Sequence, residues 1–330
     1  MDFSSLASLA SGHVEARIVQ VAVSLGVFDA LVQKGQNALS LSSSLGTEPR
    51  ATEMFLNALA SLGLLNKEGN LFSLNEISST CLVRGSPKYL GDMILFDLSL
   101  WSCWGDLEKA IRSGNAVRPA DMYQGDPPET YQFIYAMDSL VKARGDAEVL
   151  AETLDLSNVN NILDIGPGPA TYTIHLCRKN PGLRATLFDL PGTLKVTEGF
   201  VKDSGLGDRI RLETGDYRFD PIPGSYQMVF LSNIIHAESA EENNRLMRKV
   251  YQCLENKGRA LIKDHILDDS LTKPPVGAIF SLLMLLTTVQ GRCYSFNEVK
   301  AWLQEAGFKA VKEILLPLPL TSSLVVGEKG

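Results

Sequence analysis

The stretch that decides the fold reads Asn161-Ile-Leu-Asp164-Ile-Gly166-Pro-Gly168-Pro-Ala170. A short apolar, β-rich run leads into two glycines, and a helical pattern follows. Gly166 permits a tight turn, and Gly168 removes a side chain so that the backbone can approach a ligand closely. Ala170 replaces the usual third glycine with the next smallest residue. Because tight strand-to-helix turns also use glycine for purely structural reasons, this pattern alone favours a ligand site only weakly.

Acidic residues at three strand ends strengthen the prediction of a ligand. Asp164 precedes the first glycine, where an acid is expected if the ligand carries a cationic amino-acid tail instead of a pyrophosphate. Asp189 ends the next strand and can accept hydrogen bonds from ribose hydroxyls. Asp216 and Tyr217 follow the third strand and can flank an adenine ring, although Gly-Asp is also common in turns. Together they predict an adenosine-type ligand without phosphates.

The second half of the chain alternates short β-rich runs with helical segments. This alternation predicts an α/β fold with a mostly parallel, doubly wound, Rossmann-like sheet. The expected strands are Asn161–Ile165, Ala185–Asp189, Ile210–Glu213, Met228–Ser232, Ala260–Asp264, Ala310–Leu315 and Ser322–Val326.

The first third of the chain has the pattern of a winged helix. Apolar residues recur at helical spacing up to Gly26, and again over 51–62 after Pro49. Two short apolar runs around Glu68-Gly69-Asn70 then predict a hairpin. The second helix carries no basic residue beyond the flanking Arg50, so it is poorly suited to DNA phosphates. We therefore expect a packing or dimerisation module.

Composition excludes several function classes. The 330 residues carry a formal net charge of −7, which argues against a nucleic-acid partner. The five cysteines form no CxxC pair, and no His/Asp/Glu cluster suggests a metal. The apolar run 276–289 is shorter than the ~20 residues of a membrane span and predicts a buried helix instead. The N-terminal residues lack a signal-peptide pattern, so we expect a cytoplasmic protein.

With these motifs the sequence resembles the O-methyltransferases of the caffeate/acetylserotonin type, which include bacterial antibiotic- and pigment-tailoring enzymes of secondary metabolism. The resemblance covers nearly the whole chain. It implies an S-adenosylmethionine-dependent homodimer that methylates an aromatic or polycyclic small molecule. It also implies a winged-helix-like dimerisation domain (1–95), a helical connection and lid over the active site (96–155) and a Rossmann-like methyltransferase domain (156–330). The motifs that carry it are Asp164-x-Gly166-x-Gly168, Phe188-Asp189-Leu190-Pro191, Gly215-Asp216-Tyr217 and Ile235-His236.

The resemblance also assigns binding roles. Asp164 would lie near the cofactor's amine, Asp189 would hold the ribose, and Asp216 with Tyr217 would border the adenine. The full cofactor-binding set is Asp164, Gly166, Gly168, Asp189, Leu190, Asp216, Tyr217, Ser232 and Asn233. The acceptor-binding set is Phe133, Met137, Met284 and Trp101.

His236 matches the family's general base, and Asp264 matches its first acidic partner. An imidazole can accept a phenolic proton near neutral pH as the oxygen attacks the sulfonium methyl group. Two positions depart from the family. Cys293 stands where plant members have a second acid, and Ala237-Glu238 replaces the frequent Asp-Trp.

These departures leave the acceptor and the role of His236 open. O-methylation with His236 as base is the main hypothesis. C-methylation of a pigment or other polycyclic acceptor and a non-catalytic cofactor-binding homologue are the alternatives. Pro167 and Pro169 disfavour a nicotinamide-dependent oxidoreductase, which needs phosphate-cradling glycines. The other histidines, His13, His175 and His265, are expected to be structural.

Overall fold

The computed structural model describes residues 1–317 and 319–330, which divide into two compact units. The first unit contains Met1–Trp101 and Tyr135–Ala143, and the second contains Ser102–Ile134 and Arg144–Gly330. The long helix α9 (Pro127–Arg144) contributes residues to both units. The domain boundaries expected at residues 95 and 155 remain predictions.

The first unit follows the predicted order of helices and then a hairpin. Helix α1 ends at Gly26, whose φ of +73° favours glycine and whose N–H caps the last turn. In α4, Pro49 occupies the first turn, where it loses no hydrogen bond. Fully buried apolar side chains such as Phe28 and Leu56 form the core. The elements are α1 Phe3–Leu25, α2 Val27–Ala30, α3 Ala38–Leu45, α4 Pro49–Ser61, β1 Leu65–Glu68, β2 Leu71–Leu74, α5 Glu76–Cys81 and α6 Gly91–Ser99.

The second unit is built on a seven-stranded sheet with the order β5-β4-β3-β6-β7-β9-β8. Strands β5 to β7 are parallel, and β9 runs antiparallel to both β7 and β8. Each expected strand is present. The largest difference is at β7, which begins at Leu254 instead of Ala260 because Leu254 pairs with Tyr226 across an irregular register. The strands are β3 Asn161–Ile165, β4 Arg184–Asp189, β5 Ile210–Thr214, β6 Tyr226–Ser232, β7 Leu254–Asp264, β8 Phe308–Leu315 and β9 Ser323–Lys329.

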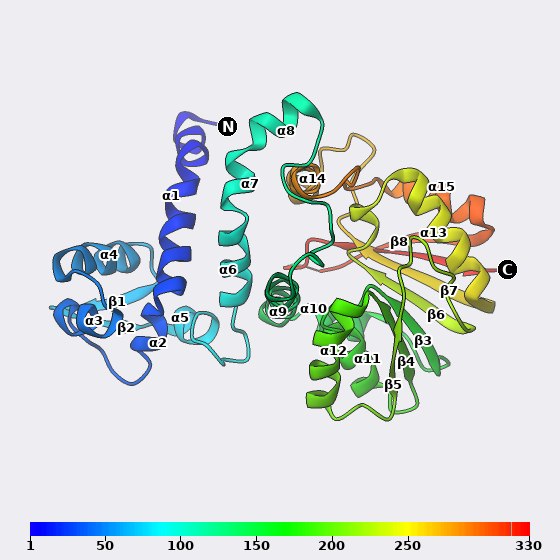
Figure 1. The fold of residues 1–330 in the computed structure, drawn as a ribbon, viewed down its shortest axis with the longest axis horizontal. Coiled ribbons are helices and arrows are strands. Elements are labelled where there is room, and N and C mark those ends of the chain that lie inside the picture. Colours follow the sequence, from blue (N-terminus) through cyan, green and yellow to red (C-terminus); the bar gives the residue numbers. More distant parts are fainter. Residues whose placement is uncertain (318) are drawn as a thin grey trace. The chain divides into compact units, whose positions relative to one another are not determined.

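Helices cover both faces of this sheet, with α10 to α12 on one side and α13 and α15 on the other (Figure 1). This arrangement buries the strands on both faces, so their sequences read as continuous apolar runs. Helix α7 (Trp101–Gly105) belongs to this unit from Ser102 onward. The remaining elements of the unit are α8 Leu107–Ser113, α10 Asp146–Thr153, α11 Thr171–Lys179, α12 Pro191–Ser204, the 3₁₀ turn η1 Ile235–Ala237, α13 Ala240–Cys253, α14 Pro275–Thr287 and α15 Phe296–Ala306.

The apolar helix α14 corrects one expectation. It was expected to be buried, but only Gly277, Met284, Leu286 and Thr287 are buried, and Ile279 is 59% exposed. The helix packs on one face only within this chain, so its high apolar content does not mean full burial. Over the described residues, none of the helices combines the length and apolarity that a membrane crossing requires.

Candidate functional site

The glycine loop after β3 forms a tight turn. Gly166 has a φ of +65°, and its N–H donates to the Phe188 carbonyl over 2.9 Å. A Cβ at this position would lie 2.3 Å from Cδ1 of Ile234, so both backbone geometry and space favour glycine. Ala170, where a third glycine is usual, also has a positive φ of 59° and precedes α11.

Asp164 is a buried carboxylate with one unsatisfied oxygen. Its Oδ2 accepts a hydrogen bond from the Thr173 hydroxyl over 2.5 Å, while Oδ1 has no hydrogen-bond partner among the described residues. Burial raises the pKa of this carboxyl to about 7. A buried polar atom without a partner usually has a reason in native proteins, and a bound cation is one such reason. The site therefore fits a ligand that brings an ammonium group.

Asp189 ties the glycine loop to the end of β4. Its Oδ1 accepts from the Leu190 N–H over 2.7 Å and its Oδ2 from the Gly168 N–H over 3.2 Å. Burial raises the pKa of Asp189 to about 6. A carboxylate offers about four lone-pair positions, so these two bonds leave capacity for ligand hydroxyls.

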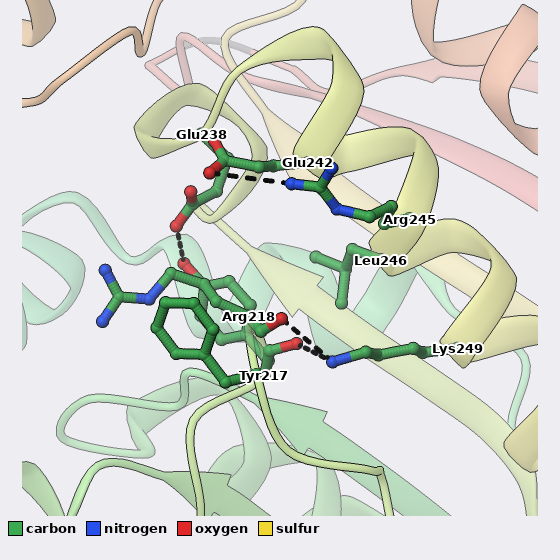
Figure 2. A pocket seen from close by; sticks show the side chains of 8 residues that line it. Tyr217, Arg218, Glu238, Glu242, Arg245, Leu246 and Lys249 are labelled. Atoms are coloured by element: carbon green, nitrogen blue, oxygen red, sulfur yellow. Dashed lines mark hydrogen bonds and ion pairs between the residues drawn. The ribbon is translucent and has the colours of Figure 1, made fainter.

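The loop after β5 carries Asp216 and Tyr217. Asp216 forms an ion pair with Arg218 over 2.7 Å. Burial alone would raise the pKa of Asp216, but the hydrogen bonds and charge of Arg218 lower it on balance. Tyr217 points inward, and its hydroxyl donates to Oε1 of Glu238 over 2.7 Å (Figure 2).

The end of β6 leads directly into the turn that holds His236. Asn233 adopts a left-handed conformation with a φ of +57°, and its N–H donates to the Lys263 carbonyl over 2.7 Å. This turns the chain away from Ser232 and into η1. The capping box of Ser239 and Glu242 then starts α13, as the sequence predicted.

His236 and Asp264 form a buried pair. The His236 Nδ1 lies 2.8 Å from Oδ1 of Asp264, and both side chains are almost completely buried. Burial alone would raise the pKa of Asp264, but its contacts with His236 and His265 lower it on balance, so the carboxyl is ionised. A carboxylate can only accept, so Nδ1 carries the proton in this bond. The Nε2 lone pair is then free to accept a proton.

Three neighbours shape the surroundings of His236. The Phe280 ring contacts His236 edge-on, with 4.9 Å between centroids. Gly291 packs so closely that a Cβ there would lie 2.4 Å from the His236 carbonyl oxygen. Cys293 is buried, and burial raises the pKa of its thiol to about 12, so the thiol stays neutral. Asp264 is therefore the carboxylate that pairs with His236 in the part of the chain described.

The second unit contains most of the predicted site residues. The strand-end residues lie along the carboxyl edge of β3 to β7. Phe133 stacks on Tyr123 with 4.4 Å between centroids, and Met284 is buried on α14. Trp101 and Met137 belong to the first unit, so their acceptor-binding roles stay predictions. The residues of the second unit are Phe133, Asp164, Gly166, Gly168, Asp189, Leu190, Asp216, Tyr217, Ser232, Asn233, His236, Asp264 and Met284.

Two family profiles match the sequence. The O-methyltransferase domain matches residues 107–309, and the O-methyltransferase dimerisation domain matches residues 7–84. The chain belongs to the O-methyltransferase family. The predicted family, enzyme class and fold, a Rossmann-like domain preceded by a helical dimerisation domain, are confirmed. The relative PigF of Serratia sp. is named as an S-adenosyl-L-methionine-dependent methyl transferase, which agrees with the predicted cofactor.

Relatives named as methyltransferases align along nearly the full chain. The tetracenomycin polyketide synthesis 8-O-methyl transferase TcmO of Streptomyces glaucescens is 31% identical over 95% of this chain and 93% of its own. The 3-hydroxy-5-methyl-1-naphthoate 3-O-methyltransferase of Streptomyces sahachiroi is 28% identical over 98% and 95%. An L-tyrosine C(3)-methyltransferase of Streptomyces lavendulae is 27% identical over 93% and 87%. The structure of human N-acetylserotonin methyltransferase in complex with SAM shares the fold, with a TM-score of 0.89 and 23% identity over 100% of this chain and 99% of that one.

Several contacts around the candidate site residues escaped the sequence analysis. Thr173 holds Asp164, and a hydroxyl in the first turn of α11 gave no distinct signal. His265 was expected to be structural. Its backbone N–H donates to Oδ1 of Asp264 over 2.7 Å, and its ring lies 5.0 Å from that of Phe280. Lys263, whose carbonyl accepts from Asn233, is buried, and burial lowers the pKa of its ammonium to about 8. A lysine inside an apolar strand is visible in the sequence, but its contacts are not.

Proposed function

We propose that this protein is an S-adenosylmethionine-dependent methyltransferase that methylates a hydroxyl group on an aromatic or polycyclic small molecule. The observation that carries the proposal is the buried pair of His236 and Asp264, with 2.8 Å between Nδ1 and Oδ1. It lies on the turn after β6, at the carboxyl edge of the sheet where α/β proteins bind their ligands.

The strand-end residues suit the parts of the cofactor. The bound cofactor supplies a methyl group on a positively charged sulfur. The free Oδ1 of Asp164 is suited to the ammonium of its amino-acid tail. Asp189 has spare acceptor capacity for the ribose hydroxyls. Asp216 and Tyr217 would border the adenine, with the loop that carries them held in place through Arg218 and Glu238.

His236 would then act on the acceptor. Its Nε2 would take the proton of the acceptor hydroxyl as that oxygen bonds to the methyl carbon, whose bond to the sulfur would break and leave a neutral thioether. Asp264 keeps Nδ1 protonated and stabilises the imidazolium that results. The rest of the rate comes from holding the two reactants in line.

C-methylation is the second candidate, and the neutral Cys293 favours it. With this thiol in the place of an acid, His236 is paired with a single carboxylate, Asp264. A relative named as an L-tyrosine C(3)-methyltransferase supports the same alternative. Transfer of a ¹³C-labelled methyl group separates the two, because a methoxy carbon and a carbon-bound methyl differ widely in NMR chemical shift.

Calorimetric titration tests the cofactor first. We expect micromolar binding of S-adenosylmethionine and S-adenosylhomocysteine and none of NAD. Asp189→Ala should weaken this binding by about tenfold or more, since charged hydrogen bonds contribute roughly 1.5–3 kcal/mol each. Binding of NAD alone, or of no nucleoside, would contradict the proposal. Cofactor binding without turnover on any phenolic or polycyclic acceptor would indicate a non-catalytic homologue.

We also propose that the protein is a homodimer, built through its dimerisation domain. Helix α1 presents Phe3, Leu6, Leu9 and Val14 to solvent within the single chain, with Phe3 85% exposed. Such a row of exposed apolar side chains marks an interaction surface. Light scattering coupled to gel filtration should give twice the 36.0 kDa chain mass. Leu6→Asp with Leu9→Asp should give monomers, and a monomeric wild type would rule the dimer out.

A further inference from the structure

We propose that Glu238 is a positioning residue that couples the loop after β5 to the turn that carries His236. The coupling runs through the buried hydrogen bond between Glu238 and Tyr217. It rests on the proposed function, because these two segments are the ones proposed to hold the adenine and to carry the base.

The hydrogen bond itself is short and shielded from solvent. The Tyr217 hydroxyl donates to Oε1 of Glu238 over 2.7 Å, and the two residues are only 7% and 6% exposed. Figure 2 shows the phenol and the carboxylate pointing at each other from the two segments. A hydrogen bond to a carboxylate in such surroundings is about twice as strong as a neutral one. Motion of one loop is therefore transmitted to the other.

The backbone of Glu238 is held as firmly as its side chain. Its carbonyl accepts from the Tyr294 hydroxyl over 2.6 Å. Asn243 donates through Nδ2 to the Ile235 carbonyl over 2.8 Å and more weakly to the Glu238 carbonyl over 3.4 Å. These hydrogen bonds fix both ends of η1, and His236 lies between them. A shift of Glu238 would therefore move the turn η1, which orients His236 against Asp264.

The cavity beside this bond does not provide another explanation. Its volume of about 30 Å³ has room for about one water molecule, so it cannot hold an organic ligand. Arg218, Glu242 and Arg245 also line it. Lys249 holds the loop from the other side, since its ammonium donates to the Tyr217 carbonyl over 2.8 Å. The polar groups here thus bind the chain to itself.

The coupling also gives a reason for one departure from the family. Members with Asp-Trp after the histidine have an indole where this chain has Glu238. Here a carboxylate faces a phenol, and the two loops are joined by a directional bond.

Tyr217→Phe tests the coupling because it removes one oxygen and keeps the ring. We expect about tenfold weaker binding of S-adenosylhomocysteine, a lower kcat, and faster hydrogen exchange of the backbone amides in 235–239 in the cofactor-free protein. Glu238→Ala should match it, and the double variant should add little further. Glu238→Gln should keep binding, kcat and amide exchange close to their wild-type values, because its amide oxygen can still accept a hydrogen bond from Tyr217.

Tyr226→Phe is the matched control. Tyr226 is also buried, at 6% exposure, but it begins β6 at the opposite end of the strand. The Tyr226→Phe variant also removes one phenol oxygen, and it should leave S-adenosylhomocysteine binding, kcat and amide exchange at 235–239 unchanged. Equal behaviour of the two Tyr→Phe variants would overturn the coupling while the methyltransferase proposal stands. Coupled exchange in a protein that does not bind the cofactor would support the link between the loops and reject the proposed function.

Discussion

Replacing His236 with alanine is expected to lower kcat by roughly 10²–10⁴-fold, the usual contribution of a general base. The Nδ1 proton is committed to Asp264, so Nε2 is the atom that can receive the acceptor's proton. Alanine leaves no base at that position, and water must take the proton instead. Single-turnover rates with saturating cofactor and acceptor measure the effect on the transfer step.

The binding of S-adenosylhomocysteine is the control for this variant. It should change little, because the His236 side chain is not among the residues proposed to bind the cofactor. Thermal unfolding must be followed as well, since the loss of His236 leaves the buried carboxylate of Asp264 without its hydrogen-bond partner. A folded His236→Ala variant with wild-type kcat would refute the assignment of the base. It would leave methyl transfer itself intact and favour C-methylation or transfer driven by alignment alone.

The sheet could be predicted from the sequence because each strand is a short apolar run with clear ends. Strand β3 was placed at its observed limits, and the glycines after it fixed the start of the next helix. The early start of β7 was missed, since Glu255 to Lys257 are polar and join the strand only through pairing near Tyr226. Periodicity carries no information about such tertiary pairing.

The site residues at strand ends could be predicted for a simple reason. Parallel strands end at one edge of a sheet, so Asp164, Asp189 and His236 are brought to the same edge by topology alone. The partners of these residues could not be predicted in the same way. The bond from Tyr217 to Glu238 depends on the course of two loops, and the contact of Phe280 with His236 depends on where α14 lies.

Replacing Asp164 with asparagine is expected to have two opposite effects. Cofactor binding should weaken by roughly 10–100-fold, because the variant loses the charge that faces the ammonium. Stability at pH 8 should rise at the same time. The pKa of Asp164 is raised from 3.8 to about 7 by burial, so its stabilising contribution is complete below pH 3.8 and is lost as the pH rises through 7. That difference corresponds to at most about 4 kcal/mol.

The gain in stability should be smaller than this limit. The asparagine amide places an N–H₂ group where Oδ1 of Asp164 has no partner among the described residues, and an unsatisfied donor costs about 1–3 kcal/mol. We therefore expect a Tm higher by roughly 5 °C at pH 8, and a lower Tm near pH 4, where the Asp164 carboxyl is protonated and nothing offsets the cost of the amide. Calorimetric unfolding at both pH values measures it. A lower Tm at pH 8 would show that the carboxylate is already compensated in the free protein.

The pH dependence of cofactor binding separates the charge of Asp164 from its shape. Wild-type affinity should rise between pH 6 and 8 as the Asp164 carboxyl ionises, and the Asp164→Asn variant should lose this rise. A shallower dependence around pH 6 should remain, because burial raises the pKa of Asp189 to about 6. Thr173→Val provides the comparison. The Thr173 hydroxyl lowers the pKa of Asp164, so its removal should move the midpoint to higher pH without abolishing the rise. If affinity is flat from pH 6 to 8 in the wild type, the ammonium does not bind at Asp164.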